Sequence, residues 1–99
     1  MELFNIMESL HRFENVLRKL VLPMFPRIGD VKVEYERALT HDVKITYYVL
    51  DRLDSSEAFK IDAETKALYS MMGFEKFHQL WITYRSVDEN NIGKEFYSR

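Results

Sequence analysis

The sequence has no cysteine, few residues that break regular structure, and no long apolar run. Disulfide bonds and thiolate metal sites are therefore excluded. Three glycines and two prolines in 99 residues are too few for a low-complexity disordered chain. Charged residues interrupt the first hydrophobic stretch, so neither a signal peptide nor a membrane span is expected there. We expect a soluble cytoplasmic protein with no membrane partner.

The residues that are present indicate one globular domain over residues 1–99. Hydrophobic residues make up 46% of the chain and aromatic residues 14%, which is enough for one core at this length. Sixteen acids and fourteen bases are interspersed, for a net charge of −2. Nucleic-acid-binding domains usually carry a basic face, so a nucleic-acid partner is not expected.

A helix is predicted over residues 2–21, because apolar side chains recur there at alternating spacings of three and four. These are Leu3, Ile6, Leu10, Phe13, Leu17 and Leu20. Glu8 with Arg12 and Glu14 with Arg18 are i,i+4 pairs of opposite charge in the favourable order. Pro23 is expected to help end the helix.

The apolar stripe of this helix is wider than one core contact needs. Phe4, Met7, Val16 and Val21 lie beside it. A helix in a two-layer domain needs an apolar arc of about 100°. We therefore predict that Leu10 and Phe13 belong to the core, and that Phe4 and Met7 form the contact of a homodimer.

An antiparallel hairpin is predicted over residues 31–50. In residues 31–36 apolar and charged side chains alternate, as in a strand with one face in water. Residues 43–50 are rich in β-branched and tyrosine residues, which favour strands. The alternation places Tyr47 and Tyr48 on opposite faces, with Tyr48 and Lys44 on the wetter one.

The second half of the chain predicts a helix and one more strand. Residues 58–61 could form a short strand before a helix near 62–73, which would begin at Asp62 as the N-cap and end at Gly73. Residues 74–80 are ambiguous, and 81–87 are predicted to form a strand. The tail, residues 92–99, is predicted to be an edge strand or frayed.

These elements define an α+β domain with an N-terminal amphipathic helix, an antiparallel sheet and a second helix. The alternative is an all-α three-helix bundle, because the apolar residues of 31–53 also recur at helical spacing. The β-branched residues of 43–49 favour the α+β fold.

Sequence motifs of catalysis and cofactor binding are missing. The three glycines are isolated, so no phosphate-binding loop exists. His11, His41 and His78 lack a second ligand at a spacing typical of metal sites. We expect no enzyme activity, no metal and no cofactor.

The aromatic residues instead predict a protein interface, because tyrosine and tryptophan are enriched in interfaces. The candidate interface residues are Phe4, Met7, Tyr48, Trp81 and Tyr84. The expected function is a protein–protein interaction module: a small regulator, inhibitor or adaptor of the kind found among viral and mobile-element proteins. The alternatives are a subunit of an oligomeric assembly and an acidic mimic of nucleic acid that uses residues 51–64. The small net charge argues against the mimic.

Overall fold

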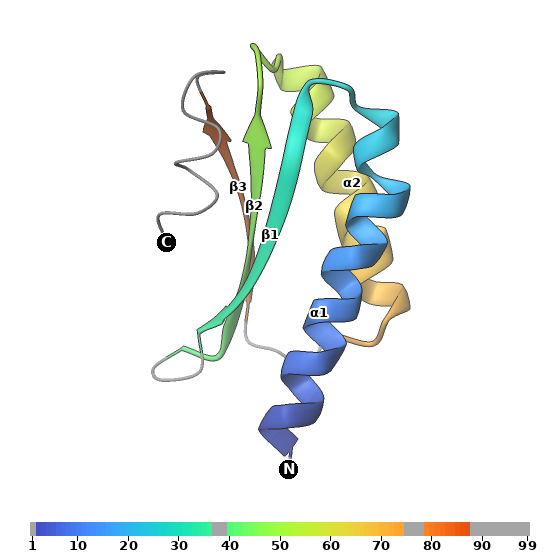
Figure 1. Cartoon of the computed structure of the whole chain (residues 1–99), viewed down its shortest axis with the longest axis vertical. Coiled ribbons are helices and arrows are strands. Elements are labelled where there is room, and N and C mark those ends of the chain that lie inside the picture. The colour runs from blue at the N-terminus through green and yellow to red at the C-terminus, as the bar shows by residue number, and fades with distance from the viewer. Residues whose placement is uncertain (1, 37–39, 75–78, 88–99) are drawn as a thin grey trace.

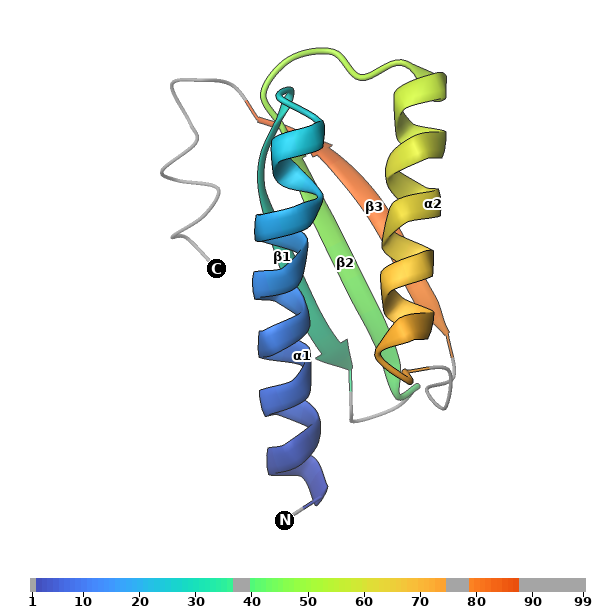
Figure 2. The ribbon, with the colours of Figure 1, turned by 90° about the vertical axis from the view of Figure 1, so that its right-hand side faces the viewer.

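The computed structural model describes residues 2–36, 40–74 and 79–87, with side chains from Asn5 onward. Two helices cover one face of a three-stranded sheet (Figures 1 and 2). The elements in chain order are α1 (Glu2–Leu20), the 3-10 turn η1 (Leu22–Met24), β1 (Ile28–Glu36), β2 (Asp42–Val49), α2 (Ser55–Met71) and β3 (Leu80–Ser86). The α+β prediction is confirmed, and the all-α alternative is not supported.

Helix α1 turns its predicted apolar stripe toward the core, with one exception among the side chains that the structure describes. Leu10, Phe13 and Leu17 are buried, as predicted for the core. Leu20 is 54% exposed, and Val21 is buried instead. An alternation of three and four drifts by about 20° per heptad around a straight helix. Leu20 has therefore rotated to the edge of the contact, and Val21 takes its place in the core.

Strands β1 and β2 form the predicted antiparallel hairpin, and the register runs from Glu36 opposite Asp42 to Ile28 opposite Val49. The ladder has a bulge next to Gly29. A Cβ atom at position 29 would lie 2.7 Å from the Cδ2 atom of Leu50, so glycine allows the close approach of these two segments.

Helix α2 begins earlier than the sequence predicted, which corrects two assignments. Asp54 is the N-cap in place of Asp62, and its side chain accepts a 2.8 Å hydrogen bond from the Glu57 N–H. Residues 58–61 are helical and form no strand. Ala58 and Ile61, three residues apart, lie toward the protein, whereas Phe59 is 75% exposed. Residues 58–61, which resemble a short strand in the sequence, form the second turn of this helix.

The end of α2 confirms the predicted role of Gly73. Its φ of 76° lies in the left-handed region, which glycine adopts without steric cost. The Gly73 N–H donates to the Ser70 carbonyl, and the Phe74 N–H donates to the Tyr69 carbonyl. The rings of Phe74 and Tyr69 pack with their centroids 5.4 Å apart. This is a Schellman motif with its hydrophobic contact.

Strand β3 confirms the strand predicted near 81–87 and corrects the prediction of an all-antiparallel sheet. It lies beside β2 and runs parallel to it, so the sheet is mixed with β2 in the centre. The long β2–α2–β3 connection returns the chain to the same end of the sheet before β3 begins, which is what a parallel pair requires. The prediction for residues 92–99 lies outside the described residues.

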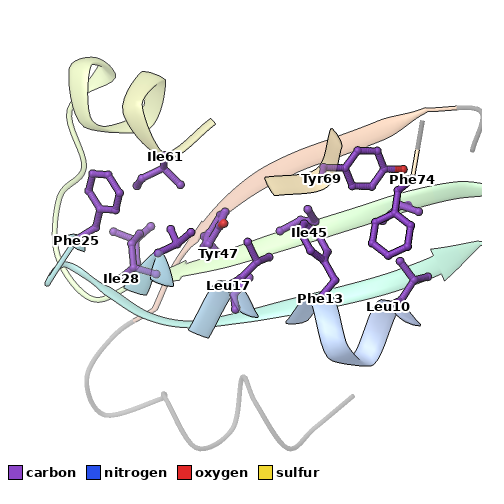
Figure 3. Packing of buried hydrophobic residues seen from close by; sticks show 14 residues of the cluster. Leu10, Phe13, Leu17, Phe25, Ile28, Ile45, Tyr47, Ile61, Tyr69 and Phe74 are labelled. Atoms are coloured by element: carbon purple, nitrogen blue, oxygen red, sulfur yellow. The ribbon is translucent and has the colours of Figure 1, made fainter. Parts of the chain in front are cut away.

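The core lies between the sheet and the two helices (Figure 3). Phe13 of α1 meets Tyr69 and Phe74 edge-to-face, with ring centroids 5.8 and 5.5 Å apart. The buried Thr65 hydroxyl donates to the Ile61 carbonyl at 2.7 Å. It has no second proton, so the Tyr47 hydroxyl, 2.6 Å away, donates to it. One hydrogen-bond chain thus ties β2 to α2.

Candidate interaction surface

The face of the sheet opposite the helices carries polar side chains around one tryptophan. The register of β2 with β3 sets Lys44 beside Trp81, Thr46 beside Thr83 and Tyr48 beside Arg85. We call this surface the open face and define it by Glu34, Lys44, Thr46, Trp81, Thr83 and Arg85. These residues line a hollow of about 770 Å³. Within residues 2–36, 40–74 and 79–87, no helix or further strand covers it.

Trp81 is held in place at the rim of the hollow. Its indole Nε1 donates a 2.8 Å hydrogen bond to Oδ2 of Asp42, which is only 7% exposed. Trp81 as a whole is 46% exposed. A ring fixed in this way can enter a contact with little loss of conformational entropy.

The middle of the open face is formed by two threonines. Thr83 Oγ1 lies 3.3 Å from the Ile45 carbonyl oxygen and 3.3 Å from Thr46 Oγ1. Lys44 and Glu34 face each other across β1 and β2. The hollow therefore offers hydroxyl groups, both signs of charge and an aromatic ring.

Both predicted interface tyrosines pack against other parts of the protein. Tyr48 lies on the face that the alternation predicted, but it is only 1% exposed. Tyr84 faces the helices. Its ring stacks on Tyr47 with an interplanar angle of 18°, and its hydroxyl donates to Asp62. Tyr84 also contributes to the lining of the hollow, whereas Tyr48 does not.

The residues predicted for the first-helix contact lie in the other layer of the domain. Met7 is 49% exposed on α1, which covers the opposite face of the sheet. The side chain of Phe4 is outside the described residues. Thus the structure does not bring Met7 and Trp81 together on one surface.

Two tyrosines have displaced pKa values. Burial raises the pKa of Tyr47 to about 12, and the charge of Asp62 adds to this although the Thr65 hydrogen bond opposes it. Burial also raises the pKa of Tyr84, and so does its hydrogen bond to Asp62. Both hydroxyl groups join the sheet to α2, so the shifts mark structural contacts.

Most acids of segment 51–64 have structural partners. Asp54 caps α2, Glu57 accepts a 3.3 Å hydrogen bond from Arg27, and Asp62 accepts from Tyr84. His11 and His41 are exposed, and His78 lies outside the described residues. Among the residues that the structure describes, no three His, Asp or Glu side chains gather as a metal site would need.

Sequence reasoning missed Asp42 and Thr83. The alternation within residues 81–87 does place Trp81, Thr83 and Arg85 on one face. It does not show that this face continues the one with Lys44 and Thr46, because that depends on the parallel pairing. The buried carboxylate of Asp42 had no local signal.

Comparison of the chain with family models, with curated proteins and with solved structures gave no match. The function is therefore argued from the residues themselves. Neither described helix combines the length and the apolar character that a membrane crossing requires.

Proposed function

We propose that this protein is a non-enzymatic interaction module that binds a protein partner through the open face of its sheet. The observation that carries the proposal is the half-exposed Trp81, fixed by buried Asp42 at the rim of a hollow. Tryptophan is among the residues that contribute most binding energy when a partner buries it. The threonines and charges around it supply the polar rim of such a contact.

The open face suits a small regulator, inhibitor or adaptor better than the acidic-mimic alternative. Lys44 and Arg85 stand among Glu34, Glu36 and Asp42 in the lining of the hollow, so its charge is mixed. In segment 51–64, Asp54, Glu57 and Asp62 accept hydrogen bonds from other groups of the protein, so they are not free to imitate phosphates. A partner whose surface carries both signs of charge therefore complements this face. A nucleic-acid-binding protein, whose binding site is basic, complements it less well.

We also propose that the protein forms a homodimer, a property separate from the binding of a different protein through the open face. The exposed Met7 supports the homodimer predicted through α1. The edge of the sheet is a second surface through which two copies of the chain can associate.

Photo-crosslinking tests the heteromeric proposal. A photoreactive phenylalanine derivative replaces Lys44 on the open face or, as the control, Lys66 on the solvent side of α2; both lysines are exposed. We expect one protein to be crosslinked from position 44 in cells that express the chain, and not from position 66.

The captured protein is then purified and its affinity measured. Lys44→Glu should raise the Kd by about tenfold or more, since it reverses a charge inside the contact. Lys66→Glu, the same change outside the contact, should leave the Kd unchanged. Equal effects of the two substitutions would contradict the proposed surface.

A further inference from the structure

The outer edge of β1 is covered by side chains of α1 and of β1 itself. Arg18 donates to the Val31 carbonyl at 3.0 Å, and Glu14 accepts from the Val33 N–H at 2.8 Å. Asp30 accepts from the Val31 N–H at 2.8 Å. Arg18 also pairs with both carboxylates, which fixes the cluster. Backbone groups occupied in this way cannot pair with another strand, so the β1 edge is protected along this part of its length.

Among the residues that the structure describes, none covers the outer edge of β3 in this way. The Val43 N–H donates to the Gln79 carbonyl at one end of the pairing with β2. At the other end the Val87 N–H donates to the Val49 carbonyl. Alternate residues of a strand face its neighbour, so these bonds fix which ones turn outward. The outward backbone groups belong to Leu80, Ile82, Tyr84 and Ser86. In the described ranges, no group forms a hydrogen bond to them.

We propose that the β3 strands of two copies of this chain pair antiparallel, around a twofold axis at Thr83. Thr83 is the midpoint of β3. In this register Ile82 lies opposite Tyr84 of the second copy, and Leu80 opposite Ser86. Every outward N–H and C=O of both strands is then paired, and the two sheets become one sheet of six strands.

A second copy fits this edge because the edge is complementary to itself. On the open face the register sets Trp81 opposite Arg85 of the second copy, and an arginine over an indole is a favourable contact. On the helix side it sets Ile82 opposite Tyr84, a β-branched and aromatic pair typical of paired strands. One patch thus meets the same patch, as a twofold dimer requires.

This inference does not rest on the heteromeric function proposed above, and it differs from a dimer through α1. The β3 dimer uses backbone groups of the sheet edge and leaves Met7 exposed. It also joins the two open faces side by side, so each dimer would present two tryptophans on one surface.

A charge exchange at the twofold axis tests the register. Thr83 is exposed, and in the dimer it lies opposite itself. We expect the wild type to have twice the 11.9 kDa chain mass by light scattering at micromolar concentration. Thr83→Lys or Thr83→Glu places like charges face to face and should raise the dimer dissociation constant about tenfold or more. An equimolar mixture of the two variants should restore a dimer that contains one chain of each.

Two controls distinguish the loss of the β3 contact from a general effect of added charge. Asn15→Lys, at an exposed position of α1, should remain dimeric. In hydrogen exchange the Ile82 and Tyr84 amides should gain protection as concentration rises, whereas the Thr83 amide, which faces β2, should be protected throughout. A monomeric wild type would overturn the proposal. So would a dimer that persists in both Thr83 variants, and Met7→Lys as the only change that dissociates it would place the contact on α1.

Discussion

The indole nitrogen of Trp81 is bonded to the carboxylate of Asp42 at 2.8 Å, across 39 positions of sequence. Asp42 is the first residue of β2, and Trp81 is the second residue of β3. The bond therefore joins the two parallel strands at their starting ends. It fixes the orientation of the ring that the proposed function depends on, and it gives the buried carboxylate a donor.

Removal of that donor should destabilise the protein. Trp81→Phe keeps a ring but leaves the buried carboxylate of Asp42 without its indole partner, which costs about 1–3 kcal/mol. Asp42→Asn keeps an oxygen acceptor for the indole and should cost less. Urea unfolding of both variants measures the difference. Equal stability of Trp81→Phe and the wild type would show that the bond does not stabilise the fold.

The ion pairs Glu14–Arg18 and Glu8–Arg12 have the same spacing but should contribute differently to the free energy of unfolding. Glu14→Ala removes the acceptor of the Val33 N–H as well as a partner of Arg18, so we expect a loss of about 1–2 kcal/mol. Glu8→Ala removes only the exposed 3.5 Å pair with Arg12 and should cost at most about 0.5 kcal/mol. Denaturant titration compares the two, and similar losses would mean that covering the β1 edge adds nothing.

Substitution of a buried and of an exposed phenylalanine tests which of the two side chains belongs to the core. Phe13 is fully buried between α2 and the sheet, and Phe13→Ala should cost about 3–5 kcal/mol. Phe59 is 75% exposed on α2, and Phe59→Ala should change stability by no more than about 0.5 kcal/mol. The melting temperatures should separate clearly. A large loss in Phe59→Ala would place that ring in a contact.

The end of α2 should be sensitive to a single methyl group. Gly73→Ala forces a side chain into a φ of 76° and should cost about 1 kcal/mol. Gly73→Asn should cost less, since asparagine tolerates this conformation better. Nothing lies within 4 Å of a Cβ atom at this position, so any loss comes from the backbone. Thermal unfolding measures both variants.

Alkaline pH should destabilise the protein through Tyr47. Burial raises the pKa of Tyr47 in the folded protein to about 12, above the value of about 10 in the unfolded chain. The folded state therefore keeps a proton that the unfolded state loses. This stabilisation is fully present below pH 10 and is lost as pH rises toward 12, by about 1.4 kcal/mol per pH unit. Tyr47→Phe should reduce the slope of stability against pH, and an unchanged slope would contradict the assignment.

The sequence alone predicted the elements whose cause is local. Spacings of three and four along α1, alternation in β1 and β-branched residues in β2 act over one or two turns or strand repeats, so they can be read without the fold. Gly73 was predicted correctly as a helix end for the same reason. The start of α2 was placed too late, because Asp54 and Asp62 are both good N-caps and local rules do not choose between them.

Tertiary structure decided the rest. The parallel pairing of β3 with β2 depends on a helical connection that returns the chain across the sheet, and no local pattern encodes that direction. The same pairing brings Asp42 to Trp81 and forms the open face. Likewise, Tyr48 is buried although it lies on the open face, and Tyr84 packs toward α2 because alternation from Trp81 turns it to the helix side. Residue type predicted that aromatic side chains matter, but only the packing of distant segments determined which of them a partner could reach.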